Sequence, residues 1–96
     1  MEDTSKFQIF ETDEFISKLD GLPRRRGKAI RAKLLSHIYP QVEKQPFYGA
    51  NIRKLRGFRA DVWRYRIGDY RIFYTVDEGN RVVSMVTIED RKYAYR

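Results

Sequence analysis

The sequence predicts an α+β domain of two layers, in which two N-terminal helices pack on one face of an antiparallel sheet in the order β-α-α-β-β-β. Three observations lead to this prediction: helical apolar patterns within residues 13–38, an alternating hairpin within 61–76 and a last apolar strand within 81–88. A sheet with one apolar face needs a layer of helices to cover it. Because the chain has 96 residues, 42% of them hydrophobic, we expect a single domain over residues 1–96.

The first strand and the first helix are predicted in the region before Gly21. Residues 6–10 alternate apolar and polar side chains, which is typical of a short strand. Thr12 or Glu11 can cap a helix that begins at Asp13, where acidic residues interact favourably with the helix dipole. We expect Gly21 to end this helix, since glycine is common just after the last helical residue.

A second helix is predicted from Pro23 to about residue 38, because proline is tolerated in the first turn of a helix. Apolar residues recur at every fourth position of this helix: Ile30, Leu34 and Ile38. We expect Pro40 to end the helix, since proline cannot donate a helical hydrogen bond. Residues 41–57 contain one proline and two glycines and are predicted to form a loop.

The stretch DVWRYRIGDYRIFYTV, residues 61–76, predicts strands at 62–67 and 70–76 joined by the two-residue turn Gly68-Asp69. Glycine adopts the positive φ of a type II′ turn without strain. This turn fixes the register, so that Ile67 lies opposite Tyr70. One side of the hairpin then carries six apolar or aromatic residues and is expected to face the helices: Trp63, Tyr65, Ile67, Tyr70, Ile72 and Tyr74.

The other side of the hairpin is basic. In the same register, Arg64 lies opposite Phe73 and Arg66 lies opposite Arg71. Directly opposed like charges destabilise a bare hairpin, so their presence indicates that an anion binds among them. The alternative is that these arginines form only the solvated side of a half-buried sheet.

The last strand is predicted within residues 81–88, and its register is ambiguous by one residue because the strand can contain a bulge. We prefer the register in which Val82, Val86 and Ile88 face the helices, since it buries three large aliphatic side chains. Glu89 and Arg91 then lie on the basic side of the sheet.

The charge of the chain narrows the classes of function. The net charge is +7 and the isoelectric point is about 9.9, which indicates an anionic partner such as a nucleic acid or an acidic protein. There is no cysteine and only one histidine, His37, so we expect no metal and no cofactor. No apolar run is long enough to span a membrane, and there is no signal-peptide pattern, so we expect a cytoplasmic protein without a membrane partner.

The run KLRG at residues 54–57, followed by VWRYRIGDYRIFYTV and then VVSMVTIEDRKYAYR, resembles the RelE/ParE superfamily of type II toxin–antitoxin toxins, and more closely its RelE branch. The resemblance covers residues 54–95, and the preceding β-α-α order agrees with it. It implies the RelE-like microbial ribonuclease fold. It also implies a toxin that cleaves mRNA in the ribosomal A site and is neutralised by a cognate antitoxin.

The resemblance assigns roles to individual residues. Arg64 and Arg66 match basic residues that contact RNA around the scissile phosphate, and Arg71 matches the arginine that stabilises its developing charge. Arg91 and Tyr95 match the last basic residue and the C-terminal tyrosine of the site. Lys54 and Arg56 of the KLRG run are expected to contact RNA.

Other residues and other functions complete these expectations. Arg24, Arg25 and Arg26 begin the second helix, where cations oppose the helix dipole, so they form either a solvated face or the contact for the antitoxin. Glu89 is either a general base or, as we prefer, the ion-pair partner of Arg91 or Arg71. The alternative functions are a ParE-like inhibitor of DNA gyrase and a non-toxic basic module that binds RNA or protein.

Overall fold

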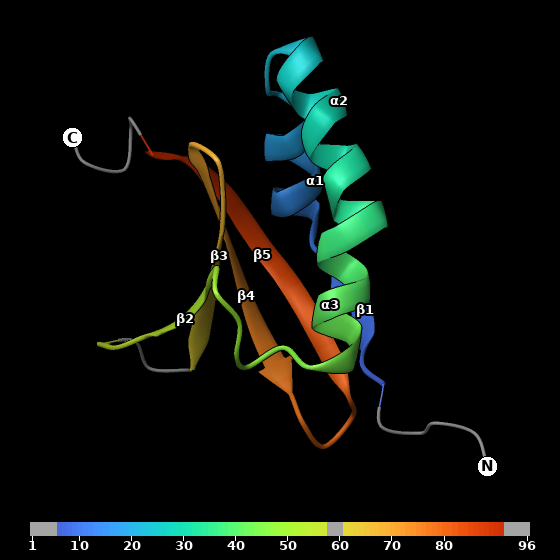
Figure 1. Ribbon diagram of the computed structural model, residues 1–96, viewed down its shortest axis with the longest axis vertical. Coiled ribbons are helices and arrows are strands. Elements are labelled where there is room, and N and C mark those ends of the chain that lie inside the picture. Colours follow the sequence, from blue (N-terminus) through green and yellow to red (C-terminus); the bar gives the residue numbers. More distant parts are fainter. Residues whose placement is uncertain (1–5, 58–60, 92–96) are drawn as a thin grey trace.

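The computed structural model describes residues 6–57 and 61–91, which form a five-stranded sheet with helices packed on one face (Figure 1). The predicted two-layer α+β fold is therefore confirmed. The elements in chain order are β1 (Gln8–Glu11), α1 (Asp13–Asp20), α2 (Arg24–Lys33), η1 (Leu34–Ile38), α3 (Tyr39–Lys44), β2 (Ile52–Leu55), β3 (Val62–Ile67), β4 (Tyr70–Asp77) and β5 (Val82–Asp90). Within the described ranges, no helix is both long and apolar enough to cross a membrane.

The sheet differs from the predicted one in two respects. Its strand order is β1-β5-β4-β3-β2, and β1 runs parallel to β5, so the sheet is mixed rather than antiparallel. The expected loop over residues 41–57 contains β2, which pairs antiparallel with β3. The loop prediction was wrong because it relied on the proline and glycines near this four-residue segment. The segment is a strand because it pairs with β3, and its local sequence pattern does not indicate this.

The second helix does not end at Pro40. The helical path continues through η1 and α3 to Lys44, as the long green rod of Figure 1 shows. The segment Leu34–Ile38 is a π-helix, and the Tyr39 N–H donates to the Leu34 carbonyl. This wider turn comes just before Pro40, which has no N–H to donate back to the preceding turn, and the helix nevertheless continues to Lys44.

The central hairpin has the predicted register, with Trp63 opposite Tyr74 and Ile67 opposite Tyr70. Gly68 has a φ of 58°, as the predicted turn requires. Five of the six residues predicted to face the helices are buried, and Ile67 is partly buried against the same core. The Tyr74 hydroxyl donates to the Pro46 carbonyl at 2.6 Å, and burial raises its pKa, so it stays a neutral donor that holds the loop after α3.

A β-bulge in β5 corrects the register predicted for the last strand. Met85 lies opposite Tyr74 and Thr87 lies opposite Phe73, so Val86 is the extra residue. Val83, Met85 and Ile88 are buried against the helices, whereas Val82 and Val86 are only partly buried. The prediction for Val82 and Val86 was wrong because it assumed one alternation along the whole strand. After the bulge the alternation matches the predicted register again, so Ile88 faces the helices and Glu89 lies on the opposite side of the sheet, as predicted.

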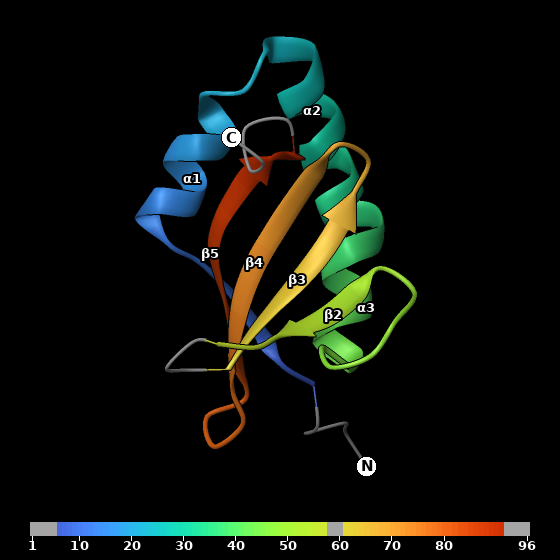
Figure 2. The ribbon, with the colours of Figure 1, turned by 90° about the vertical axis from the view of Figure 1, so that its left-hand side faces the viewer.

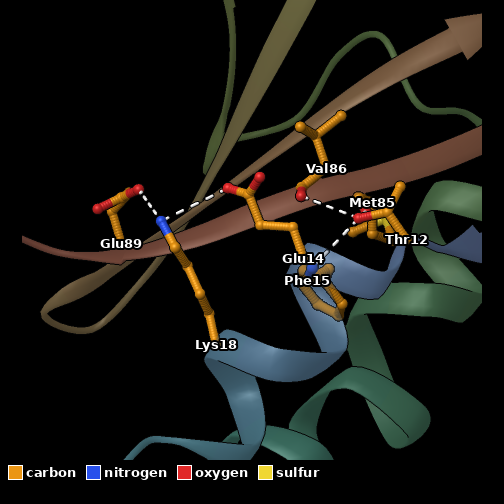
Figure 3. Close-up of polar contacts among 7 residues, drawn as sticks. All are labelled: Thr12, Glu14, Phe15, Lys18, Met85, Val86 and Glu89. Carbon is orange, nitrogen blue, oxygen red and sulfur yellow. Dashed lines mark hydrogen bonds and ion pairs between the residues drawn. The ribbon is translucent and has the colours of Figure 1, made fainter.

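Thr12 connects this bulge to the start of α1 (Figure 3). Its hydroxyl donates to the carbonyl oxygens of Met85 at 2.8 Å and Val86 at 3.0 Å, and accepts a hydrogen bond from the Phe15 N–H at 3.1 Å. Thr12 is therefore both the N-cap of α1, as predicted, and the partner of two carbonyls at the bulge.

Candidate functional site

The face of the sheet turned away from the helices, which Figure 2 views directly, carries two rows of directly opposed residues. We call this surface the open face. The first row runs across β3, β4 and β5, and the second also includes β2. Their members are Arg66, Arg71 and Glu89 in the first row, and Arg53, Arg64, Phe73 and Thr87 in the second. The predicted site residues Arg64, Arg66 and Arg71 are thus brought together.

Arg53 is a member of this cluster that the sequence prediction missed. It lies directly opposite Arg64 and is exposed. The segment itself carries no signal for it, because Ile52-Arg53-Lys54-Leu55 does not alternate apolar and polar residues. Only the pairing of β2 with β3 assigns Arg53 to the open face, since a residue in a loop has no assigned face.

The arginines differ in how firmly they are held. Arg64 and Arg71 are partly buried, and the Nε atom of each is covered by protein, whereas Arg66 is exposed. Packing of the side-chain stems on the sheet limits their rotamers, so less conformational entropy is lost when a ligand binds. A planar guanidinium can hold two phosphate oxygens at once, which makes this cluster suited to a phosphodiester.

Arg91 follows β5 at the hairpin end of the open face. Its backbone N–H donates to the Asp69 carbonyl at 2.7 Å, which ties the end of β5 to the turn Gly68-Asp69. The Arg91 side chain is exposed. Arg91 therefore lies beside the turn of the hairpin, at the end of the sheet where Arg66 and Arg71 lie.

Glu89 contributes a carboxylate beside Arg71. The sequence prediction paired it with Arg91 or Arg71, but the structure adds a partner from the helical layer: Lys18 of α1 lies 2.7 Å from Glu89 Oε2 (Figure 3). Lys18 also contacts Glu14 at 3.5 Å. The hydrogen bond to Glu89 raises the pKa of Lys18, so the lysine is a permanent cation that orients this carboxylate.

A sequence model described as the ParE toxin of the type II toxin–antitoxin system, parDE, matches residues 9–95. The chain belongs to this toxin family. A comparison with curated protein sequences finds no match.

Solved structures of related toxins have the same fold. The toxin–antitoxin complex RelBE2 from Mycobacterium tuberculosis matches with a TM-score of 0.71 and 20% identity, over 95% of this toxin and 98% of that chain. The archaeal RelE–RelB complex from Pyrococcus horikoshii OT3 matches with a TM-score of 0.68 and 21% identity, over 90% of this toxin and 96% of that chain. The YoeB/ParE toxin from Agrobacterium tumefaciens matches with a TM-score of 0.69 and 16% identity, over 88% of this toxin and 98% of that chain. Membership of the RelE/ParE superfamily is thus shown, as predicted.

Not every residue expected at the toxin's site lies on the open face. Lys54 lies opposite Trp63, with its ammonium 5.5 Å from the centre of the Trp63 ring and 3.5 Å from Asp61, so it projects to the other side of the sheet. Arg56 is exposed directly after β2. Tyr95 lies outside the described residues.

The three arginines expected to contact an antitoxin are exposed at the start of α2. Arg26 donates to the Tyr70 hydroxyl at 3.4 Å, a bond that connects α2 to the central hairpin and raises the pKa of Arg26. Arg24 borders a hollow that also contains Asp20 and Arg31, which form an ion pair. The toxin therefore has two basic surfaces, one on the helical layer and one on the open face.

Proposed function

We propose that this toxin is an endoribonuclease that cleaves mRNA in the ribosomal A site and that a cognate antitoxin neutralises it. The observation that carries the proposal is the gathering of Arg53, Arg64, Arg66 and Arg71 on the open face, with Arg91 at its end. Binding to a protein target gives no reason for this dense arrangement of phosphate-binding groups, whereas an RNA substrate does.

The reaction uses the substrate's own 2′-hydroxyl as the nucleophile. The 2′-oxygen loses its proton and attacks the adjacent phosphorus, while the bond from phosphorus to the 5′-oxygen breaks and that oxygen takes a proton. The products are a 2′,3′-cyclic phosphate and a free 5′-hydroxyl. In this scheme Arg71, partly buried between Arg66 and Glu89, stabilises the negative charge that develops on the phosphate oxygens.

Proton transfer is assigned to other groups, since an arginine stays protonated and cannot act as a base. Glu89 is the carboxylate that lies directly opposite Arg71, and Lys18 orients it. In this proposal Glu89 accepts the proton of the 2′-hydroxyl. The family pattern adds Tyr95, which in the proposal orients the nucleophile or stacks on a base.

Growth arrest through loss of translation is the expected result of inducing this toxin in bacterial cells. Pulse labelling should show protein synthesis falling before DNA synthesis, and mapping of mRNA ends should show new cleavage sites within reading frames. A variant with Arg64, Arg66 and Arg71 all changed to alanine is the matched control and should not stop growth. Cells that keep translating while their growth stops would contradict the ribonuclease.

The second candidate is inhibition of DNA gyrase, and the ParE description of the matching family favours it. This activity needs a binding surface and no catalytic group. The same induction experiment separates the two candidates, because a gyrase inhibitor changes the supercoiling of a reporter plasmid before it affects protein synthesis. A chain that affects neither process would be the non-toxic binding module.

The antitoxin is proposed because relatives of this fold were solved as RelE–RelB and RelBE2 complexes. We expect a neighbouring short acidic reading frame to encode a partner that covers Arg24, Arg25 and Arg26. Changing these three residues to glutamate should slow association and remove most of its salt dependence, because charges at an interface mainly set the association rate. Stopped-flow kinetics at several salt concentrations measures this. Unchanged kinetics would place the antitoxin elsewhere.

A further inference from the structure

A cleft of about 250 Å³ opens where the end of β3 faces the helical layer. Lys33 and His37 contribute to it from α2 and η1, and Arg66 and Gly68 contribute from the hairpin. The other lining residues are Ile38, Asn51, Tyr65 and Ile67. The cleft lies beyond the end of β2, which pairs with β3 only as far as Tyr65.

The cleft is basic. Lys33, His37 and Arg66 are exposed, and none of them forms an ion pair with any residue in the described ranges. No carboxylate of the described residues lines the cleft; Asp69 lines a neighbouring groove that shares Lys33, Ile67 and Gly68 with it. The cations Lys33 and Arg66 repel each other, and a bound anion removes that repulsion.

Arg66 makes this cleft continuous with the open face. It lies directly opposite Arg71 on the sheet and also lines the cleft. Its backbone N–H donates to the Asn51 carbonyl at 2.9 Å, which fixes this part of β3. A chain of phosphates that occupies the arginine cluster can therefore pass over the edge of β3 and reach Lys33 and His37.

We propose that the cleft binds a backbone phosphate of the RNA substrate next to the phosphate held by Arg64 and Arg71. This inference rests on the proposed ribonuclease function and adds Lys33 and His37 to the residues that contact substrate. Lys33 supplies an ammonium and His37 a ring N–H donor, both of which bind phosphate oxygens. The cleft is smaller than the sites of drug-sized ligands, about 300–1,000 Å³, and suits a phosphate with its ribose.

The test is the affinity of the toxin for a fluorescent single-stranded RNA of about eight nucleotides, made of 2′-O-methyl nucleotides so that it cannot be cleaved. Fluorescence anisotropy at several salt concentrations compares the wild type with Lys33→Gln and His37→Ala. The matched control is Lys44→Gln, which removes an exposed cation of α3 outside the cleft and the open face. Arg64→Ala reports separately on the arginine cluster.

We expect Lys33→Gln to weaken binding several-fold and to lower the slope of log affinity against log salt by about 0.7, as the loss of one phosphate contact does for single strands. His37→Ala should weaken binding by about 2- to 10-fold through the loss of a hydrogen bond. Lys44→Gln should change neither quantity by a comparable amount.

Three results would overturn the proposal, and only the last would also overturn the proposed function. If Arg64→Ala weakens RNA binding but the Lys33 and His37 variants match Lys44→Gln, the cleft carries no phosphate and the ribonuclease proposal survives. The same conclusion holds if Lys33→Gln weakens only the complex with the antitoxin, because the cleft is then a protein contact. If Arg64→Ala also leaves RNA binding unchanged, the proposed function fails together with this inference.

Discussion

Arg71→Ala is expected to lower the rate of single-turnover mRNA cleavage on programmed ribosomes by about 100-fold or more, the usual effect of removing one donor that stabilises charge in a transition state. Ribosome affinity should fall only a few-fold, because Arg53, Arg64 and Arg66 remain on the open face. The fold should persist, since the side chain lies on the face away from the core and its removal relieves the repulsion from Arg66.

Two controls define this experiment. Lys44→Ala removes an exposed cation from α3 and should cleave at the wild-type rate. Circular dichroism and thermal unfolding of both variants confirm that each is folded. A folded Arg71→Ala toxin that cleaves as fast as the wild type would show that the chemistry takes place away from the open face.

Thr12→Val is expected to destabilise the toxin by about 2–3 kcal/mol, because it removes the cap of α1 and the hydroxyl's hydrogen bonds to two carbonyls at the bulge. The Met85 carbonyl keeps its hydrogen bond from the Thr12 backbone N–H. For a domain of this size that loss lowers the melting temperature by about 8 °C or more. Valine has nearly the same shape as threonine, so packing changes little. Chemical denaturation followed by tryptophan fluorescence measures the effect.

Thr87→Val is the matched control for this substitution. The Thr87 hydroxyl is buried and has no hydrogen-bond partner among the described residues, so its removal should be neutral or slightly stabilising. Thr12→Ser keeps the hydroxyl and should recover most of the stability. Equal losses from Thr12→Val and Thr87→Val would mean that the bulge does not depend on the threonine of α1.

The central hairpin was predicted in full because all its determinants are local. A two-residue turn at Gly68-Asp69 sets the register, and the register alone places Arg64 and Arg71 on one face. The cap at Thr12 and the helix end at Gly21 were also found from neighbouring residues.

Apart from the continuation of the helix past Pro40, the features that escaped prediction are set by distant parts of the chain. The parallel pairing of β1 with β5 joins the first strand of the sheet to the last, and β2 is a strand only because β3 lies beside it. The bulge is hydrogen-bonded by Thr12, which is 74 residues away from Val86. The missed open-face residue Arg53 and the missed ion-pair partner Lys18 both follow from such distant contacts.

The pairing of β1 with β5 also bears on when a newly made toxin becomes dangerous to the cell that makes it. During synthesis β1 leaves the ribosome before the other strands of the described residues, but its neighbour in the sheet is β5, the last of those strands to emerge. Until then β1 has no strand beside it, and Arg71 lacks the neighbouring Glu89. Pairing between strands so far apart in sequence is also slow. The surface that would bind RNA is therefore completed late, which leaves time for an antitoxin already present to meet the toxin as it folds.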